Sequence, residues 1–115
     1  MRLRDYLCVP YLLEAESLEL ASGTWIRRVS YPELPGCSTE SLVVEDALRR
    51  LEGLRIQTIM TMLDAGHSPP VPRPPLHHCN PIWVARQADL SDEIIARIDR
   101  DEDAHPQLPF AIKPM

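Results

Sequence analysis

The side chains best suited to chemistry in this sequence are three cysteines and a pair of adjacent histidines. His77, His78 and Cys79 follow one another directly, whereas Cys8 and Cys37 lie far from them in the chain. Structural zinc sites usually take ligands in pairs about two to four residues apart, because one turn then presents both side chains to the metal. Neighbouring residues of an extended chain point to opposite sides. The spacing therefore disfavours a metal site, and the sequence indicates no cofactor.

Cysteine catalysis is the second chemistry that these residues could support. Cys37 would need the fold to bring His77 or His78 beside it, and burial within a turn is the commoner fate of such a cysteine. Phosphate-binding glycine loops, Gly-x-Ser-x-Gly elbows and His-Glu-x-x-His pairs are absent from the sequence. We therefore expect no catalytic residue and a protein that is not an enzyme. An enzyme or metal protein using Cys37, Cys79 and the paired histidines stays open as an alternative.

The carboxylates also lack a catalytic pattern. Two-metal nuclease chemistry needs acids that project from strand interiors towards one point. Glu14, Glu16 and Glu19 are expected in a turn, and the acidic run at 101–103 is expected to end a helix. Charged runs at such places are usually solvated.

Composition limits the partners and the compartment. A chain of 115 residues with 44% hydrophobic and 25% charged residues is expected to form one domain with a single core. Its net charge of −5 disfavours nucleic-acid binding over the whole surface and favours a basic protein partner. Three cysteines cannot all pair, and neither a signal peptide nor a membrane-spanning apolar run is evident. We expect reduced thiols, a cytoplasmic location and no membrane contact.

Apolar periodicity and turn residues predict the main elements. An apolar, β-prone run predicts a first strand at 6–13, Ser22 and Gly23 a turn, and 24–31 a second strand. A third short strand is expected near 37–40. Helical spacing from about 42 to 65, with a change of phase at Gly53, predicts a long helix that Gly66 ends.

The second half of this helix is apolar on nearly every side, which a small sheet can hardly bury alone. Self-association, a protein partner, or a C-terminal segment that folds back would each cover the surplus. We expect a homo-oligomer or a complex, and the residues predicted to bind a partner are Ile59, Met60, Met62, Leu63, Trp83 and Ile95.

A proline-rich stretch divides the chain. Residues 68–76 are expected to run as a stiff polyproline II spacer. It separates an α+β domain at 1–67 from a C-terminal tail at 77–115, in which 81–86 reads as a strand and 90–100 as a helix capped by Asp89 or Ser91. The predicted fold class is α+β: a three-stranded antiparallel sheet packed on one long helix, plus a short C-terminal strand and helix.

The most distinctive segment is Tyr-Pro-Glu-Leu-Pro-Gly-Cys at 31–37, between the second and third predicted strands. Pro32 and Pro35 fix φ and withhold two N–H donors, and Gly36 allows a backbone turn that a Cβ would resist. With Cys37 they form a predicted structural turn, a rigid exit from the strand.

This turn, Glu-Asp-Ala-Leu at 45–48 and Asp-Ala-Gly-His-Ser-Pro-Pro-Val-Pro at 64–72 occur in an order that resembles the HicB antitoxin family. The likeness covers about residues 5–76. It implies a degenerate RNase H-like fold with a three-stranded antiparallel sheet and a long helix, and no nuclease activity. It also implies a partner, typically a small basic ribonuclease toxin that the protein binds and masks. A subunit of a larger assembly is the alternative partner.

The tail departs from that family, whose members generally end in a ribbon-helix-helix or helix-turn-helix module. Residues 82–86 and the helix at 90–100 look like the strand and first helix of a ribbon-helix-helix unit without its second helix. The tail is mainly acidic, whereas a ribbon that reads DNA inserts polar and basic side chains. A DNA-binding autorepressor is therefore the second hypothesis, and it requires two tails to pair with Arg86 outward.

Overall fold

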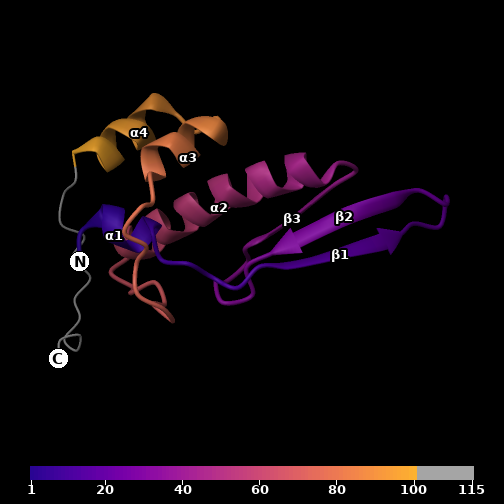
Figure 1. Ribbon diagram of the computed structural model, residues 1–115, viewed down its shortest axis with the longest axis horizontal. Helices are drawn as coiled ribbons and strands as arrows, with labels where there is room; N and C mark the ends of the chain where they lie inside the picture. Colours follow the sequence, from indigo (N-terminus) through magenta and orange to yellow (C-terminus); the bar gives the residue numbers. More distant parts are fainter. Residues whose placement is uncertain (101–115) are drawn as a thin grey trace.

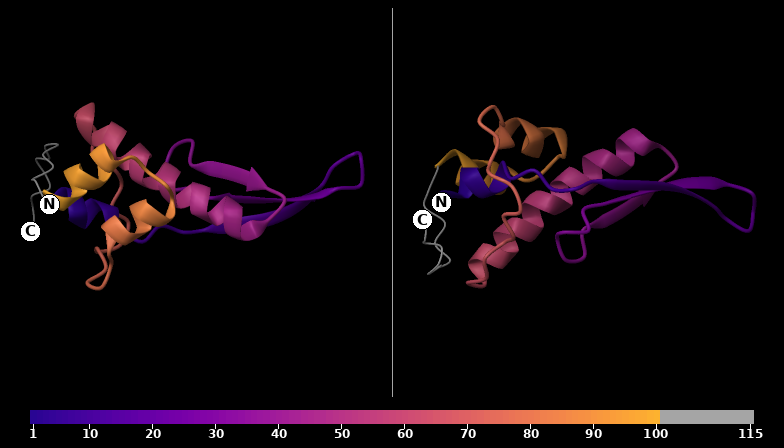
Figure 2. Two further views of the ribbon diagram at one scale, coloured as in Figure 1. Left: turned by 90° about the horizontal axis from the view of Figure 1, so that it is seen from above. Right: turned by 60° about the horizontal axis from the view of Figure 1, so that its bottom comes forward.

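The computed structural model describes residues 1–100, and the fold is α+β, as predicted (Figure 1). A three-stranded antiparallel sheet in the order β1-β2-β3 packs against one long helix, α2. The short helices α3 and α4 lie on the opposite side of α2 from the sheet, and α1 packs beside α2 (Figures 1 and 2). In chain order the elements are α1 (Leu3–Leu7), β1 (Glu14–Glu19), β2 (Trp25–Ser30), β3 (Ser38–Ser41), α2 (Val44–Asp64), α3 (Pro81–Gln87) and α4 (Asp92–Asp99).

The first two strands form a long hairpin that extends past the start of α2 (Figures 1 and 2). Its turn lies at Ser22 and Gly23, as the sequence indicates, and Gly23 has a φ of +87°, which a residue with a Cβ rarely adopts. The second and third strands lie where they were predicted. Between them, Gly36 (φ +68°) and a bond from the Tyr31 N–H to the Cys37 carbonyl oxygen close the proline turn.

The predicted first strand at 6–13 is wrong. Residues 3–7 form α1, because the Arg2 N–H is bonded to the Asp5 carboxylate and Leu3, Tyr6 and Leu7 bury one helical face. The first strand is Glu14–Glu19, which was expected to be a turn. It has few apolar residues because almost all of it is exposed, so it lacks the pattern of a half-buried strand.

Helix α2 confirms the prediction from periodicity. It ends at Asp64, and Gly66 follows with a φ of +80° while the His67 N–H bonds back to the Met62 carbonyl oxygen at 2.8 Å. On the sheet side, buried Val29 packs in the core and the Thr39 hydroxyl donates to the Ala47 carbonyl oxygen at 2.8 Å.

The predicted C-terminal strand at 81–86 is wrong, because these residues form α3. Asn80 caps this helix by accepting from the Trp83 N–H at 3.0 Å, and Pro81 occupies the first turn, where its missing N–H costs nothing. The predicted helix at 90–100 is confirmed as α4, and Ser91 is its cap. The acidic run expected to end it, at 101–103, lies outside the described residues.

Helices α3 and α4 cover the apolar surface of α2 that the sheet leaves free. Ala85 of α3 and Ile98 of α4 are fully buried in the same core as Leu51 and Ile56 of α2. Gly53 permits this approach: a Cβ built there would lie 3.2 Å from the Ala88 Cβ. The change of phase at Gly53 therefore marks the contact with the segment that folds back.

The proline-rich segment is held along residues 8–12. The Tyr11 hydroxyl donates to the Pro70 carbonyl oxygen at 2.7 Å, and the Leu76 N–H donates to the Cys8 carbonyl oxygen at 2.9 Å. The Arg73 guanidinium bonds both oxygens of the Glu33 carboxylate, at 2.9 and 3.0 Å. This fork-to-fork contact joins the segment to the proline turn.

A disulfide joins Cys8, just after α1, to Cys79, just before α3, with 5.6 Å between their Cα atoms. The expectation of three reduced thiols is therefore wrong for these two residues. Cys37 is the free cysteine, and only 3% of it is exposed. No helix within residues 1–100 has both the length and the apolar content to cross a membrane.

We expect Cys79→Ser to lower the free energy of unfolding by about 4 kcal/mol, because the disulfide closes a loop with a sequence separation of 71. Urea denaturation followed by circular dichroism measures this. A reductant should weaken the wild-type protein by a similar amount and leave Cys79→Ser unchanged. A variant that matches the oxidised wild type would contradict the role of the disulfide.

Candidate protein-binding surface

The six residues predicted to bind a partner occupy different environments. Ile59 is fully buried and Met60 is 6% exposed, so both belong to the core of this chain. Met62 is half-buried, and Leu63 and Ile95 are half-buried against the core. Trp83, in contrast, is 58% exposed. An exposed tryptophan is costly to leave in water and is the kind of side chain that anchors protein interfaces.

Trp83 forms one wall of a shallow groove of about 330 Å³ between α2 and α3. The groove combines apolar and charged side chains, and its lining residues are Glu45, Leu48, Arg49, Glu52, Trp83, Val84, Gln87 and Ala88. We call it the α2–α3 groove. Its open, mixed lining suits a side chain of another protein better than an enclosed small molecule.

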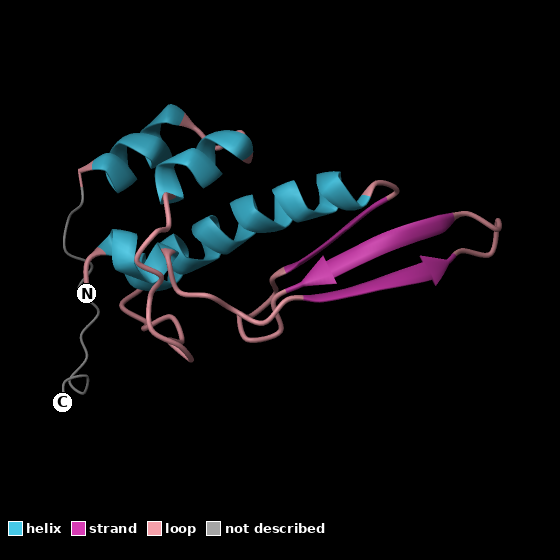
Figure 3. Cartoon of the chain, viewed as in Figure 1, coloured by secondary structure: helices cyan, strands magenta, loops and turns pink. Residues whose placement is uncertain are grey.

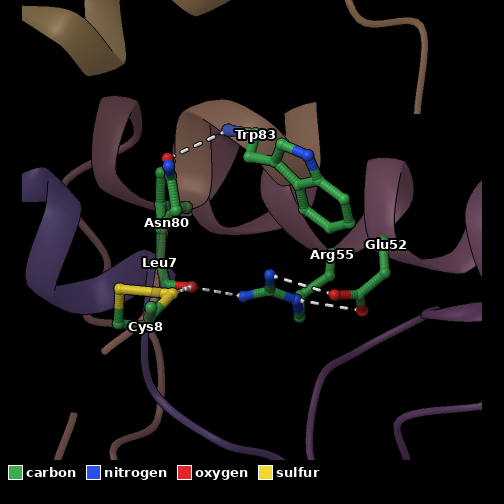
Figure 4. Close-up of a disulfide and its surroundings, with 7 residues drawn as sticks. Leu7, Cys8, Glu52, Arg55, Asn80 and Trp83 are labelled. Atoms are coloured by element: carbon green, nitrogen blue, oxygen red, sulfur yellow. Dashed lines mark hydrogen bonds and ion pairs between the residues drawn. A yellow bond between two sulfur atoms is a disulfide. The ribbon is translucent and has the colours of Figure 1, made fainter. Parts of the chain in front are cut away.

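Three neighbouring features fix the start of the helix that carries Trp83, and Figure 4 shows two of them, the disulfide and the Asn80 cap. The disulfide holds Cys79, the Asn80 side chain caps the first turn through the Trp83 N–H, and Pro81 is buried. The indole therefore extends from a short helix whose start is held both covalently and by a hydrogen bond. Figure 4 shows it lying on the side of α3 that faces Glu52.

A buried arginine, Arg55, pairs with Glu52, one of the residues that line the groove. The side chain of Arg55 is only 7% exposed, and its guanidinium donates to the Leu7 carbonyl oxygen at 2.7 Å and to the Glu52 carboxylate at 3.3 Å (Figure 4). The Tyr31 hydroxyl donates to Glu52 Oε2, which also accepts from Arg55 Nε. Burial, and then the Glu52 carboxylate, raise the pKa of Tyr31, so this hydroxyl keeps its proton. Glu52 is thereby held in one orientation.

The groove has an acidic character. Glu45 and Glu52 lie along it, and the one cation, Arg49, already contacts Asp46 at 2.5 Å. Glu52 is already paired with Arg55, so a cationic side chain of a partner would meet the carboxylate of Glu45 and the face of Trp83, which attracts cations. The arrangement can therefore bind a basic, partly apolar protein segment.

The other candidate residues from the sequence do not join this groove. Burial raises the pKa of the Cys37 thiol, which disfavours the thiolate that a nucleophile needs. His77 and His78 are both exposed. Within residues 1–100, no three His, Cys, Asp or Glu side chains are grouped so as to hold a metal ion.

Many arginines are engaged in local ion pairs, so they do not form an open basic face. Arg28 contacts Glu16 at 3.0 Å and Glu40 at 2.5 Å on the outer face of the sheet. Similar contacts with carboxylates involve Arg49, Arg50, Arg55, Arg73 and Arg97. Their charge is largely balanced within the chain.

Sequence reasoning found Trp83 but missed the groove, because it assigned residues 81–86 to a strand. The Asn80-Pro81 pair was the available signal: Asn is a favoured helix cap and Pro a favoured first residue. The β-prone run from Ile82 to Val84 outweighed it.

No protein-family model matches the chain, and neither a curated protein nor a solved structure does.

We expect Arg55→Met to lower the free energy of unfolding by about 3 kcal/mol, because the Leu7 carbonyl oxygen loses its buried donor and the Glu52 carboxylate loses its cation and keeps only the Tyr31 hydroxyl. Arg49→Met on the exposed side of the same helix is the matched control and should cost less than about 1 kcal/mol. Urea denaturation of the disulfide-bonded proteins compares them. Equal losses would mean that Arg55 has no special structural role.

Stability should also fall in alkaline solution. Burial, the largest cause, raises the pKa of Tyr11 from 10.0 to about 12, against the opposing effect of Arg55. A folded-state pKa above the unfolded one stabilises the fold below pH 10, and this contribution is lost as the pH rises from 10 towards 12. Tyr11→Phe should therefore show a shallower loss over that range, measured by urea denaturation at pH 9 and pH 11. An unchanged slope would contradict the assignment.

Proposed function

We propose that this protein is a non-enzymatic protein-binding module, similar to a HicB antitoxin, that holds a basic protein through the α2–α3 groove. The observation that carries this proposal is Trp83. It is 58% exposed on a helix that a disulfide and a side-chain cap hold in place, beside a groove with carboxylates. A rigid aromatic anchor near the carboxylate of Glu45 favours binding of a basic partner.

The order of the elements supports the HicB-like part of the proposal. A hairpin, the proline turn at 31–37, a third strand and the long helix follow one another as the resemblance implies. The net charge of −5 favours the small basic partner that such proteins typically mask. A subunit of a larger assembly with a basic surface is the alternative partner for the same groove. A cytoplasmic location and self-association remain predictions from the sequence.

The absence of a catalytic role is also proposed on specific grounds. The cysteine with a free thiol is buried with a raised pKa, and Glu52, one of the two carboxylates at the groove, is occupied by Arg55 and Tyr31. The DNA-binding alternative loses its main support, since the residues expected to form a ribbon strand form α3.

The test is to recover the tagged protein from its native cells and determine the intact masses of its complexes. Wild type should retain a small basic protein in a fixed ratio, and Trp83→Ala should lose it. Trp25→Ala is the matched control, because Trp25 is 51% exposed but lies on β2, away from the groove.

Two results would contradict this proposal. Recovery of the protein without any stoichiometric partner would remove the binding function. Loss of a partner in Trp25→Ala but not in Trp83→Ala would move the contact from the α2–α3 groove to the hairpin. Urea denaturation of both variants shows that the fold is intact.

A further inference from the structure

Strand β1 is one of the two outer strands of the sheet, and its second edge has no partner strand within residues 1–100. Five of its six residues are exposed and Leu18 is half-buried. Figure 3 shows no helix or described loop along this edge of the hairpin. An unpaired edge presents backbone N–H and C=O groups that can bind another strand.

The register shows which backbone groups point outward. The Leu20 N–H donates to the Thr24 carbonyl oxygen at 2.8 Å, and β1 and β2 pair with Glu14 opposite Ser30. In an antiparallel ladder, bonded and non-bonded pairs alternate. The even-numbered residues of β1 therefore bond to β2. The N–H and C=O groups of Ala15, Ser17 and Glu19 point away from the sheet.

The charge of three glutamates is the one usual protection that this exposed strand carries, and it acts against strands of the same sign. Natural edges are commonly blocked by lysine, proline or a β-bulge. Strand β1 reads Glu-Ala-Glu-Ser-Leu-Glu, and it pairs with β2 residue for residue over its whole length. Its outward backbone groups are therefore available in a regular array.

Its side chains select the kind of strand that can pair there. Glu14, Glu16 and Leu18 share the face opposite α2, since their partners on β2 alternate with buried Val29. Glu16 contacts Arg28, whereas no ion pair within residues 1–100 involves Glu14 or Glu19. A strand that pairs with β1 would place cationic side chains opposite Glu14 and Glu16 and an apolar side chain opposite Leu18.

A second copy of this chain fits the edge poorly. Two β1 strands side by side would bring the glutamates of both copies, Glu14, Glu16 and Glu19, into one seam. Like charges at neighbouring positions of a sheet are destabilising. Charge complementarity instead favours a segment of opposite sign.

We propose that β1 is a docking edge that accepts an extended, basic, amphipathic segment of a partner protein as a fourth strand. The inference rests on the proposed protein-binding function and adds a second contact, separate from the α2–α3 groove. Backbone hydrogen bonds to Ala15, Ser17 and Glu19 hold the added strand. Glu14, Glu16 and Leu18, which share one face of β1, select its side chains.

The probe is a capped peptide of eight residues with lysine, lysine and leucine at successive alternate positions and threonine elsewhere. Its addition to the ¹⁵N-labelled full chain should shift the amide resonances of Ala15, Ser17 and Glu19 and slow their hydrogen exchange. A peptide with glutamates in place of the lysines should not bind. The lysine peptide with N-methyl groups on the amides that face β1 should also not bind. Binding should weaken as salt is raised.

Ser17→Pro removes one outward donor while leaving the ladder to β2 intact, because its N–H is not used there. It should bind the lysine peptide about tenfold more weakly, the effect of losing about one backbone hydrogen bond. Ser17→Val is the matched control, because it keeps the N–H and should bind as wild type does. The N-methyl peptide gives the same test without altering the protein.

Equal binding of the glutamate peptide, or unchanged binding by Ser17→Pro, would overturn this inference. So would shifts confined to the α2–α3 groove, or sedimentation and exchange data showing that a second copy already protects β1. The proposed function is tested separately by the Trp83 variants, so either proposal can fail while the other stands.

Discussion

A single physical constraint organises this protein: α2 is apolar on too many sides for one small sheet to cover. Ile56, Ile59 and Met60 are all buried, and only part of that burial faces the sheet. The remainder requires a second layer. The chain supplies that layer itself by returning α3 and α4 over the face marked by Gly53, where the lack of a Cβ lets Ala88 approach closely.

The candidate site follows from this covering layer. A helix as short as α3 is not stable alone, so it has to be held by its surroundings. Its start is fixed by the disulfide and by Asn80, and its inner face by Ala85 in the core. Trp83 is on the face that remains outside. The rigidity that covers α2 therefore also fixes an exposed aromatic side chain beside the carboxylate of Glu52.

The sequence predicted those elements whose local signals and burial agree. Residues 25–30 and 44–64 have β-branched or periodic apolar patterns, and each segment has a clear stop, at Pro32 for the strand and at Gly66 for the helix. It failed where tertiary context overrode the pattern: α1 was taken for a strand, and β1, which is solvated on both faces, for a turn. Within the candidate site, Trp83 could be predicted as a binding residue only because it is a large aromatic side chain. The groove depends on a contact between α2 and α3, and no local pattern encodes it.

The disulfide between Cys8 and Cys79 has a topological consequence. It turns residues 8–79, which hold the whole sheet and α2, into a covalent ring, with α3 and α4 attached to the ring at one point. A protease that cuts the exposed hairpin turn at Ser22 opens the ring without dividing the molecule. The nicked chain keeps the mass of a single covalent species apart from one added water, and it separates into two fragments only when a reductant is present.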